Sequence, residues 1–134
     1  MKKFQEFMGK HELLLEMAKL GEIDALALII WTRDPGNIPH VHIVDVGTEG
    51  DKFDCCIRLD KAEYFKHGSH QDKLNSKQRK SIAIFMRSKI DEDSDITNYE
   101  FAVRSWNTNN PDRKLSLKRD ENKNILIPDY TLLS

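Results

Sequence analysis

Apolar residues recur along the chain with different spacings, and each spacing predicts a kind of secondary structure. In residues 4–20 leucine and methionine recur at intervals of three and four, which places them on one face of a helix. Gly21 follows where a left-handed helix end is expected. Segments 25–31, 40–45 and 53–59 are short apolar or alternating runs of strand length. We therefore predict one helix followed by three antiparallel strands.

Turn-forming residues separate these three strands. Segment 34–37 reads Asp-Pro-Gly-Asn, and segment 47–51 contains two glycines, so both favour tight turns. Short connections between consecutive strands are typical of an antiparallel meander.

Two amphipathic helices are predicted after the strands. Asn75 is a favourable N-cap for a helix that runs to about residue 90 and turns Ile82 inward. Thr97 and Glu100 form a capping-box sequence for a second helix, whose apolar residues recur at i, i+3, i+4 and i+7. The predicted fold class is α+β: a small antiparallel sheet of three to four strands, with helices packed on one face.

The pattern indicates a single domain over residues 1–134, with a C-terminal extension over 112–134. The extension is charged up to Asn124. The apolar residues 125–127 are able to add an edge strand, which Pro128 would end.

Composition narrows the class of protein. Of the 134 residues, 39% are hydrophobic and 32% are charged, with a net charge of -1, so the chain can bury one modest core and is not a bulk polyelectrolyte. The only two cysteines, Cys55 and Cys56, are adjacent, which excludes a disulfide framework. We find no signal peptide and no apolar run of membrane-spanning length. We therefore expect a cytoplasmic protein without membrane association, and without a cofactor because the common cofactor motifs are absent.

The alternating strand places two histidines on one face. His40 and His42 are two residues apart, so their side chains point the same way, about 6.5–7 Å from each other. Val41 and Ile43 would face the helices, and we expect the histidines on the less covered face. Cys56 is expected on that face of the next strand.

Arg58 is expected to share that face, together with the carboxylate of Asp54. His40 and His42 would then act as general acid and base, and Arg58 would neutralise a developing oxyanion in a metal-independent phosphodiester hydrolase. Three alternatives stay open: ordinary surface histidines, a metal site completed by a neighbouring strand, and an open sheet face that pairs with a second copy. The spacing fixes no third ligand, so we assign no metal ligands.

Charge is unevenly distributed along the second half of the chain. Residues 73–89 contain six cations and no acid, whereas 91–100 contain five acids and no cation. Lys77, Arg79 and Lys80 stand at the helix start, where the macrodipole disfavours cations. They are candidates for binding a protein or RNA partner, and the alternative is a solvated helix face.

Residues 37–42 read Asn-Ile-Pro-His-Val-His, and a strand, a basic helix and a helix containing Trp106 follow. Over about residues 30–110 the chain thereby resembles small bacterial proteins of unknown function that carry a Pro-His-x-His strand after a turn. The resemblance implies the α+β fold, a bacterial or phage origin and an association with toxin–antitoxin-like genes, and it supplies no mechanism. The sequence as a whole favours a small binding module for a protein or RNA partner. The phosphodiester hydrolase and the metal-binding or oligomerising protein are its alternatives.

Overall fold

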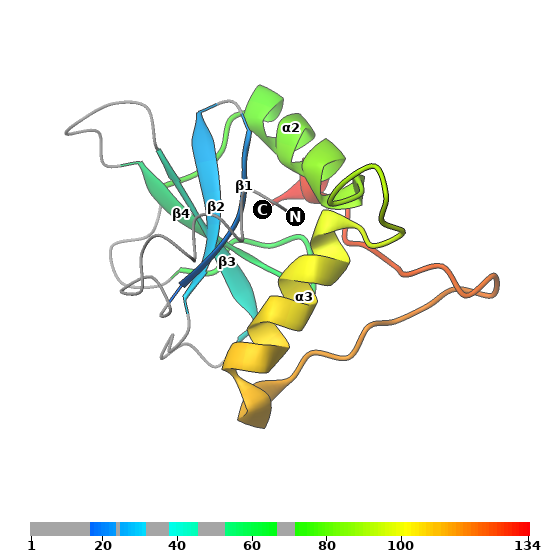
Figure 1. The fold of residues 1–134 in the computed structure, drawn as a ribbon. Helices are drawn as coiled ribbons and strands as arrows, with labels where there is room; N and C mark the ends of the chain where they lie inside the picture. Colours follow the sequence, from blue (N-terminus) through cyan, green and yellow to red (C-terminus); the bar gives the residue numbers. More distant parts are fainter. Residues whose placement is uncertain (1–16, 24, 32–37, 46–52, 67–71) are drawn as a thin grey trace.

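Four antiparallel strands form one sheet, and their order in the sheet follows their order in the chain (Figure 1). The computed structural model describes residues 17–23, 25–31, 38–45, 53–66 and 72–134. The predicted helix over residues 4–16 and the two predicted turns lie outside these ranges. The strands are β1 (Met17–Ile23), β2 (Leu26–Trp31), β3 (His40–Asp45) and β4 (Asp54–Arg58). The prediction of a small antiparallel sheet is confirmed, with four strands.

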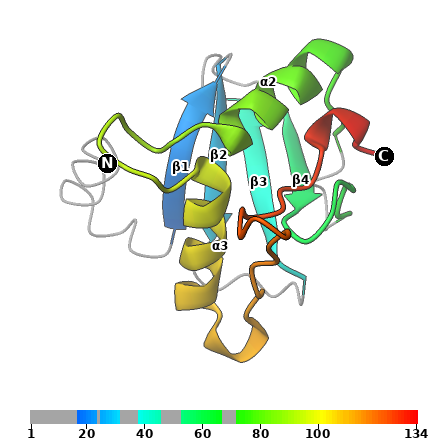
Figure 2. The same ribbon diagram turned by 90° about the vertical axis from the view of Figure 1, so that its right-hand side faces the viewer.

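Two helices follow the sheet, α2 (Ser76–Arg87) and α3 (Asn98–Asn109). Asn75 and Gln78 cap α2 reciprocally, because each side chain accepts a hydrogen bond from the other residue's backbone N–H. Thr97 caps α3 by accepting from the N–H of Glu100. Both helices lie on the same face of the sheet, as Figures 1 and 2 show. The predicted arrangement of helices on one face is therefore confirmed.

Residues 17–20 belong to strand β1, so the prediction of a helix over them is wrong. The register of β1 against β2 shifts between Lys19 and Gly21, and such a bulge hides the alternation that marks a strand. Gly21 does not end a helix either. A Cβ at this position would lie 2.8 Å from the ring of Phe85, so glycine allows α2 to pack closely on β1.

The core fills the space between the sheet and the helices. Leu28, Ile43 and Cys55 form one cross-strand row that faces the helices, and all three are fully buried. Trp106 of α3 is buried in the same core, and its indole N–H donates to the carbonyl of Arg113. The alternate residues of each strand therefore face the other side of the sheet, which we call the far face.

The C-terminal extension crosses the helix-covered face of the sheet near β4 (Figure 2). Arg119 and Ile125 form an isolated β-bridge, so this segment pairs with itself. The predicted edge strand is not among the four strands of the sheet. A short 3-10 helix, Tyr130–Leu132, contacts α2 and buries Tyr130 in the core.

Candidate functional site

The two histidines of β3 are buried, which corrects the expectation that they lie on an exposed face. His40 is 1% exposed and His42 is 2% exposed. Strand alternation places His42 on the far face, because Val41 and Ile43 belong to the helix-facing core. The ring of His40, at the start of β3, also contacts Trp106 of that core. Ile29, the cross-strand neighbour of His42, is also buried on this face.

His42 and Cys56 are directly opposite each other on neighbouring strands. The Sγ atom of Cys56 lies 3.3 Å from Nδ1 of His42 and 4.0 Å from Nε2. One ligand-capable atom from each of His40, His42 and Cys56 lies within 4.8 Å of the others. Two imidazoles and a thiol therefore form a compact buried group, which we call the HHC cluster.

The ring of His40 is held by neighbours on several sides. Its Nδ1 atom is 2.6 Å from the carbonyl oxygen of Ile38, which identifies Nδ1–H as the donor because a carbonyl can only accept. Its centroid lies 5.0 Å from that of His42, 4.7 Å from that of Phe65 and 5.3 Å from that of Trp106. These contacts fix the orientation of the imidazole.

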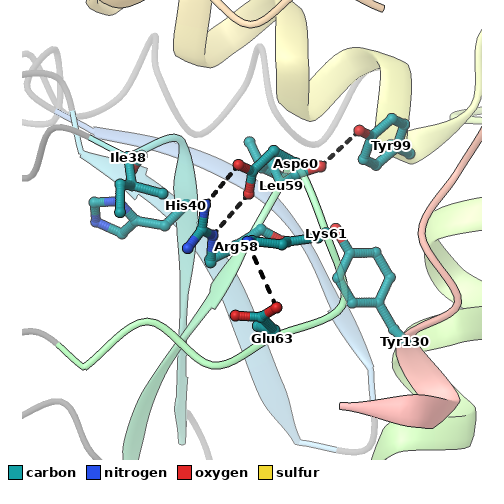
Figure 3. A network of polar contacts seen from close by, with 9 residues as sticks. All are labelled: Ile38, His40, Arg58, Leu59, Asp60, Lys61, Glu63, Tyr99 and Tyr130. Atoms are coloured by element: carbon teal, nitrogen blue, oxygen red, sulfur yellow. Dashed lines mark hydrogen bonds and ion pairs between the residues drawn. The ribbon is translucent and has the colours of Figure 1, made fainter. Parts of the chain in front are cut away.

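Arg58 stands opposite His40 in the sheet register but is engaged elsewhere. Its Nε and Nη2 atoms donate to the two carboxylate oxygens of Asp60 at 2.8 Å and 2.7 Å, as Figure 3 shows. This bidentate hydrogen bonding lowers the pKa of Asp60 and raises that of Arg58. The guanidinium proposed as an oxyanion partner is therefore already neutralised by a carboxylate.

Backbone carbonyls beside this pair accept from two tyrosines. Tyr99 donates to the carbonyl of Leu59 at 2.6 Å, and Tyr130 donates to that of Arg58 at 2.8 Å (Figure 3). Burial raises the pKa of Tyr99 to about 12, so its phenol stays protonated and able to donate. The network ties α3 and the C-terminal extension to the end of β4.

Cys55 points to the opposite side from Cys56. Burial raises the pKa of its thiol to about 12, so Cys55 is a small core side chain without nucleophilic character. The two adjacent cysteines thus have separate environments, one in the core and one in the HHC cluster.

The predicted partner-binding residues lie along the start of α2. Lys77 and Lys80 are exposed, whereas Arg79 is half-buried and donates to the carbonyl of Leu74 at 2.8 Å. Ile84 lies on the same side of the helix as the two lysines, and it is 66% exposed. We call Lys77, Lys80 and Ile84 the α2 stripe. Ile84 is not among the predicted binding residues, although it follows Lys80 by four positions and Lys77 by seven, a spacing that places all three on one side of a helix.

A cleft of about 320 Å³ lies between the end of the sheet, α3 and the C-terminal extension. Its lining combines charged, hydroxyl and apolar side chains: Asp60, Lys61, Ala62, Tyr99, Leu115, Ser116, Lys118, Leu126, Ile127, Pro128 and Asp129. Asp60 and Tyr99 are engaged in the network above, so the cleft adjoins that network and is separate from the HHC cluster.

The comparisons with known proteins return no match: no family model, no curated protein and no solved structure is significantly similar to the chain. Among the helices of the described ranges, none has the length and apolarity needed to cross a membrane.

Proposed function

We propose that the protein is a small binding module that docks an acidic, partly apolar segment of a partner protein on the α2 stripe. The observation that carries the proposal is the exposure of Lys77, Lys80 and Ile84 together on one side of a helix whose first turn contains no acid.

Electrostatics support an anionic partner at this position. The N-terminus of a helix carries a partial positive charge, and two lysine charges add to it. The acidic residues after position 90 stand beyond the C-terminal end of α2. Lys80 is seven residues, or about 10 Å along the helix axis, from the last residue of that helix. That separation exceeds the Debye length of about 8 Å at physiological salt, so those acids reduce the attraction of the lysines for an anionic partner only weakly.

The apolar member of the stripe favours protein over RNA. Ile84 offers a branched hydrocarbon surface, which packs against apolar side chains, and none of the exposed α2 side chains is aromatic. Binding of single-stranded RNA relies on aromatic stacking as well as positive charge. We therefore infer an acidic peptide segment that places a leucine-like residue on Ile84.

The site geometry gives less support to a metal-independent hydrolase. A general acid or base must reach its substrate, and His40 and His42 are almost completely buried. Arg58 is neutralised by Asp60.

We propose a bacterial or phage cytoplasmic setting, which agrees with the family resemblance and with two cysteines that form no disulfide.

Fluorescence anisotropy with a labelled amphipathic peptide that carries glutamates and leucines tests this function. We expect the wild-type chain to bind the peptide, and the double change Lys77→Glu and Lys80→Glu to weaken binding by about tenfold, equivalent to about 1.4 kcal/mol. Ile84→Ser should weaken binding too, without changing its dependence on salt.

Lys114→Glu together with Lys123→Glu is the matched control, because both lysines are exposed on the C-terminal extension. These two changes alter the net charge equally and should leave peptide affinity nearly intact. A labelled single-stranded RNA of equal charge is the competing probe. The proposal fails if the RNA binds more tightly than the peptide, or if both double variants weaken peptide binding equally.

A further inference from the structure

We propose that His40, His42 and Cys56 form a binding site for a thiophilic transition-metal ion, with Zn²⁺ as the ion that fits. The HHC cluster brings two imidazoles and a thiol within 4.8 Å of one another, and all three side chains are buried. The inference is independent of the α2 stripe, because that stripe lies on α2 and shares no residue with the HHC cluster.

Strand pairing explains why the three side chains meet. His42 and Cys56 are cross-strand partners, and His40 is the next residue of β3 on the same face. Zn–N bonds of about 2.0–2.1 Å and Zn–S bonds of about 2.3 Å separate tetrahedral ligand atoms by roughly 3.3–3.6 Å. The Sγ–Nδ1 distance of 3.3 Å between Cys56 and His42 matches that separation. The ligand atom of His40 lies within 4.8 Å of the other two, so on metal binding it would approach them by up to about 1.5 Å.

The hydrogen bond of His40 assigns its ligand atom. Because Nδ1–H donates to the carbonyl of Ile38 at 2.6 Å, Nε2 is the ring nitrogen that would bind the metal. Metal-binding histidines characteristically donate their other nitrogen to a carbonyl or carboxylate in this way. The ring contacts with Phe65 and Trp106 hold the same orientation. His40 is thus arranged as a ligand before any ion binds.

The donor set selects the class of metal. Two imidazoles and one thiolate suit Zn²⁺ and related borderline-soft ions, whereas Mg²⁺ and Ca²⁺ require oxygen donors. The apolar surroundings, which include Ile29, strengthen metal–ligand electrostatics by excluding water. These three side chains occupy three tetrahedral positions and leave the fourth to water or another donor.

Titration of the full chain with Co²⁺ under anaerobic, reducing conditions tests the site. We expect one equivalent to produce a thiolate-to-cobalt charge-transfer band, and one equivalent of Zn²⁺ to abolish it. Cys56→Ser should eliminate the band and weaken zinc binding by more than about 100-fold, beyond the loss caused by removing an outer-shell partner. Cys55→Ala is the matched control and should keep the band, because Cys55 faces the core.

A band that survives Cys56→Ser, or that disappears only in Cys55→Ala, would overturn the proposal. X-ray absorption of the zinc-loaded wild-type chain keeps the test decisive even if a variant does not fold. We expect one sulfur ligand at about 2.3 Å and at least two nitrogen ligands at about 2.0–2.1 Å. A zinc shell without sulfur would contradict the proposed site. Peptide binding by Cys56→Ser remains a separate readout, so failure here leaves the α2 stripe proposal standing.

Discussion

Arg58 was predicted to neutralise an oxyanion, but in the structure its guanidinium is paired with the carboxylate of Asp60. Both are only two positions apart at the end of β4, and their two hydrogen bonds use both carboxylate oxygens. The pair stands beside backbone carbonyls that accept from Tyr99 and Tyr130. Its role is to organise the junction where three parts of the chain meet.

Asp60→Asn tests this role through the pH dependence of stability. The folded pKa of Asp60 lies below the value of about 3.9 expected for an unfolded chain. The ionised pair therefore stabilises the fold fully above about pH 4, and this contribution is lost as pH falls through the folded pKa. We expect Asp60→Asn to lower the free energy of unfolding in urea at pH 7, with a difference from wild type that shrinks in acid.

Asp112→Asn is the control, because Asp112 is exposed and lies outside this junction. It should match wild type at both pH values. A deficit in Asp60→Asn that stays constant from pH 7 into acid would show that the pair does not act through its charges.

At the scale of elements, caps and periodicity identified most of the fold. The helices predicted after Asn75 and after Thr97 correspond to α2 and α3, because both side chains accept hydrogen bonds from backbone N–H groups at the helix starts. Residues 17–20 were wrongly predicted as helix, because a bulge and the close packing of Gly21 interrupt the alternation of apolar and polar residues that marks a strand. Such tertiary contacts carry no local sequence signal.

Gly21→Ala tests the packing of β1 against α2. The new methyl group would lie 2.8 Å from the Phe85 ring, so we expect a loss of about 1 kcal/mol in the free energy of unfolding, at the lower end for overpacking because the ring can shift. Chemical denaturation of Gly21→Ala, Phe85→Leu and the double variant measures the coupling. The double variant should be more stable than the sum of the single effects implies, and strict additivity would contradict the contact.

At the scale of the whole molecule, strand register and chain folding determine which residues meet. Alternation correctly assigned His40, His42 and Cys56 to one face, but their burial and the 3.3 Å Cys56–His42 contact depend on the register between strands. The engagement of Arg58 by Asp60 likewise depends on side-chain geometry. The position of the C-terminal extension could not be predicted from local sequence either, because Tyr130 donates to a backbone carbonyl 72 residues away in the chain.

Tyr130→Phe tests whether this long-range contact anchors the extension. The change leaves the ring buried but removes the donor to the carbonyl of Arg58, so we expect a loss of about 1 kcal/mol in unfolding free energy. Leu132→Ala is the matched control within the same short helix, because Leu132 is 69% exposed and should contribute little. Equal losses in both variants would show that the extension is not anchored by Tyr130.

The most direct test of the central claim, that β3 and β4 build one buried metal site, is anomalous diffraction at the zinc edge from crystals of the zinc-loaded chain. We expect a single strong peak bonded to Sγ of Cys56, Nε2 of His40 and a ring nitrogen of His42. Peaks confined to surface carboxylates or histidines elsewhere, with none between β3 and β4, would contradict it.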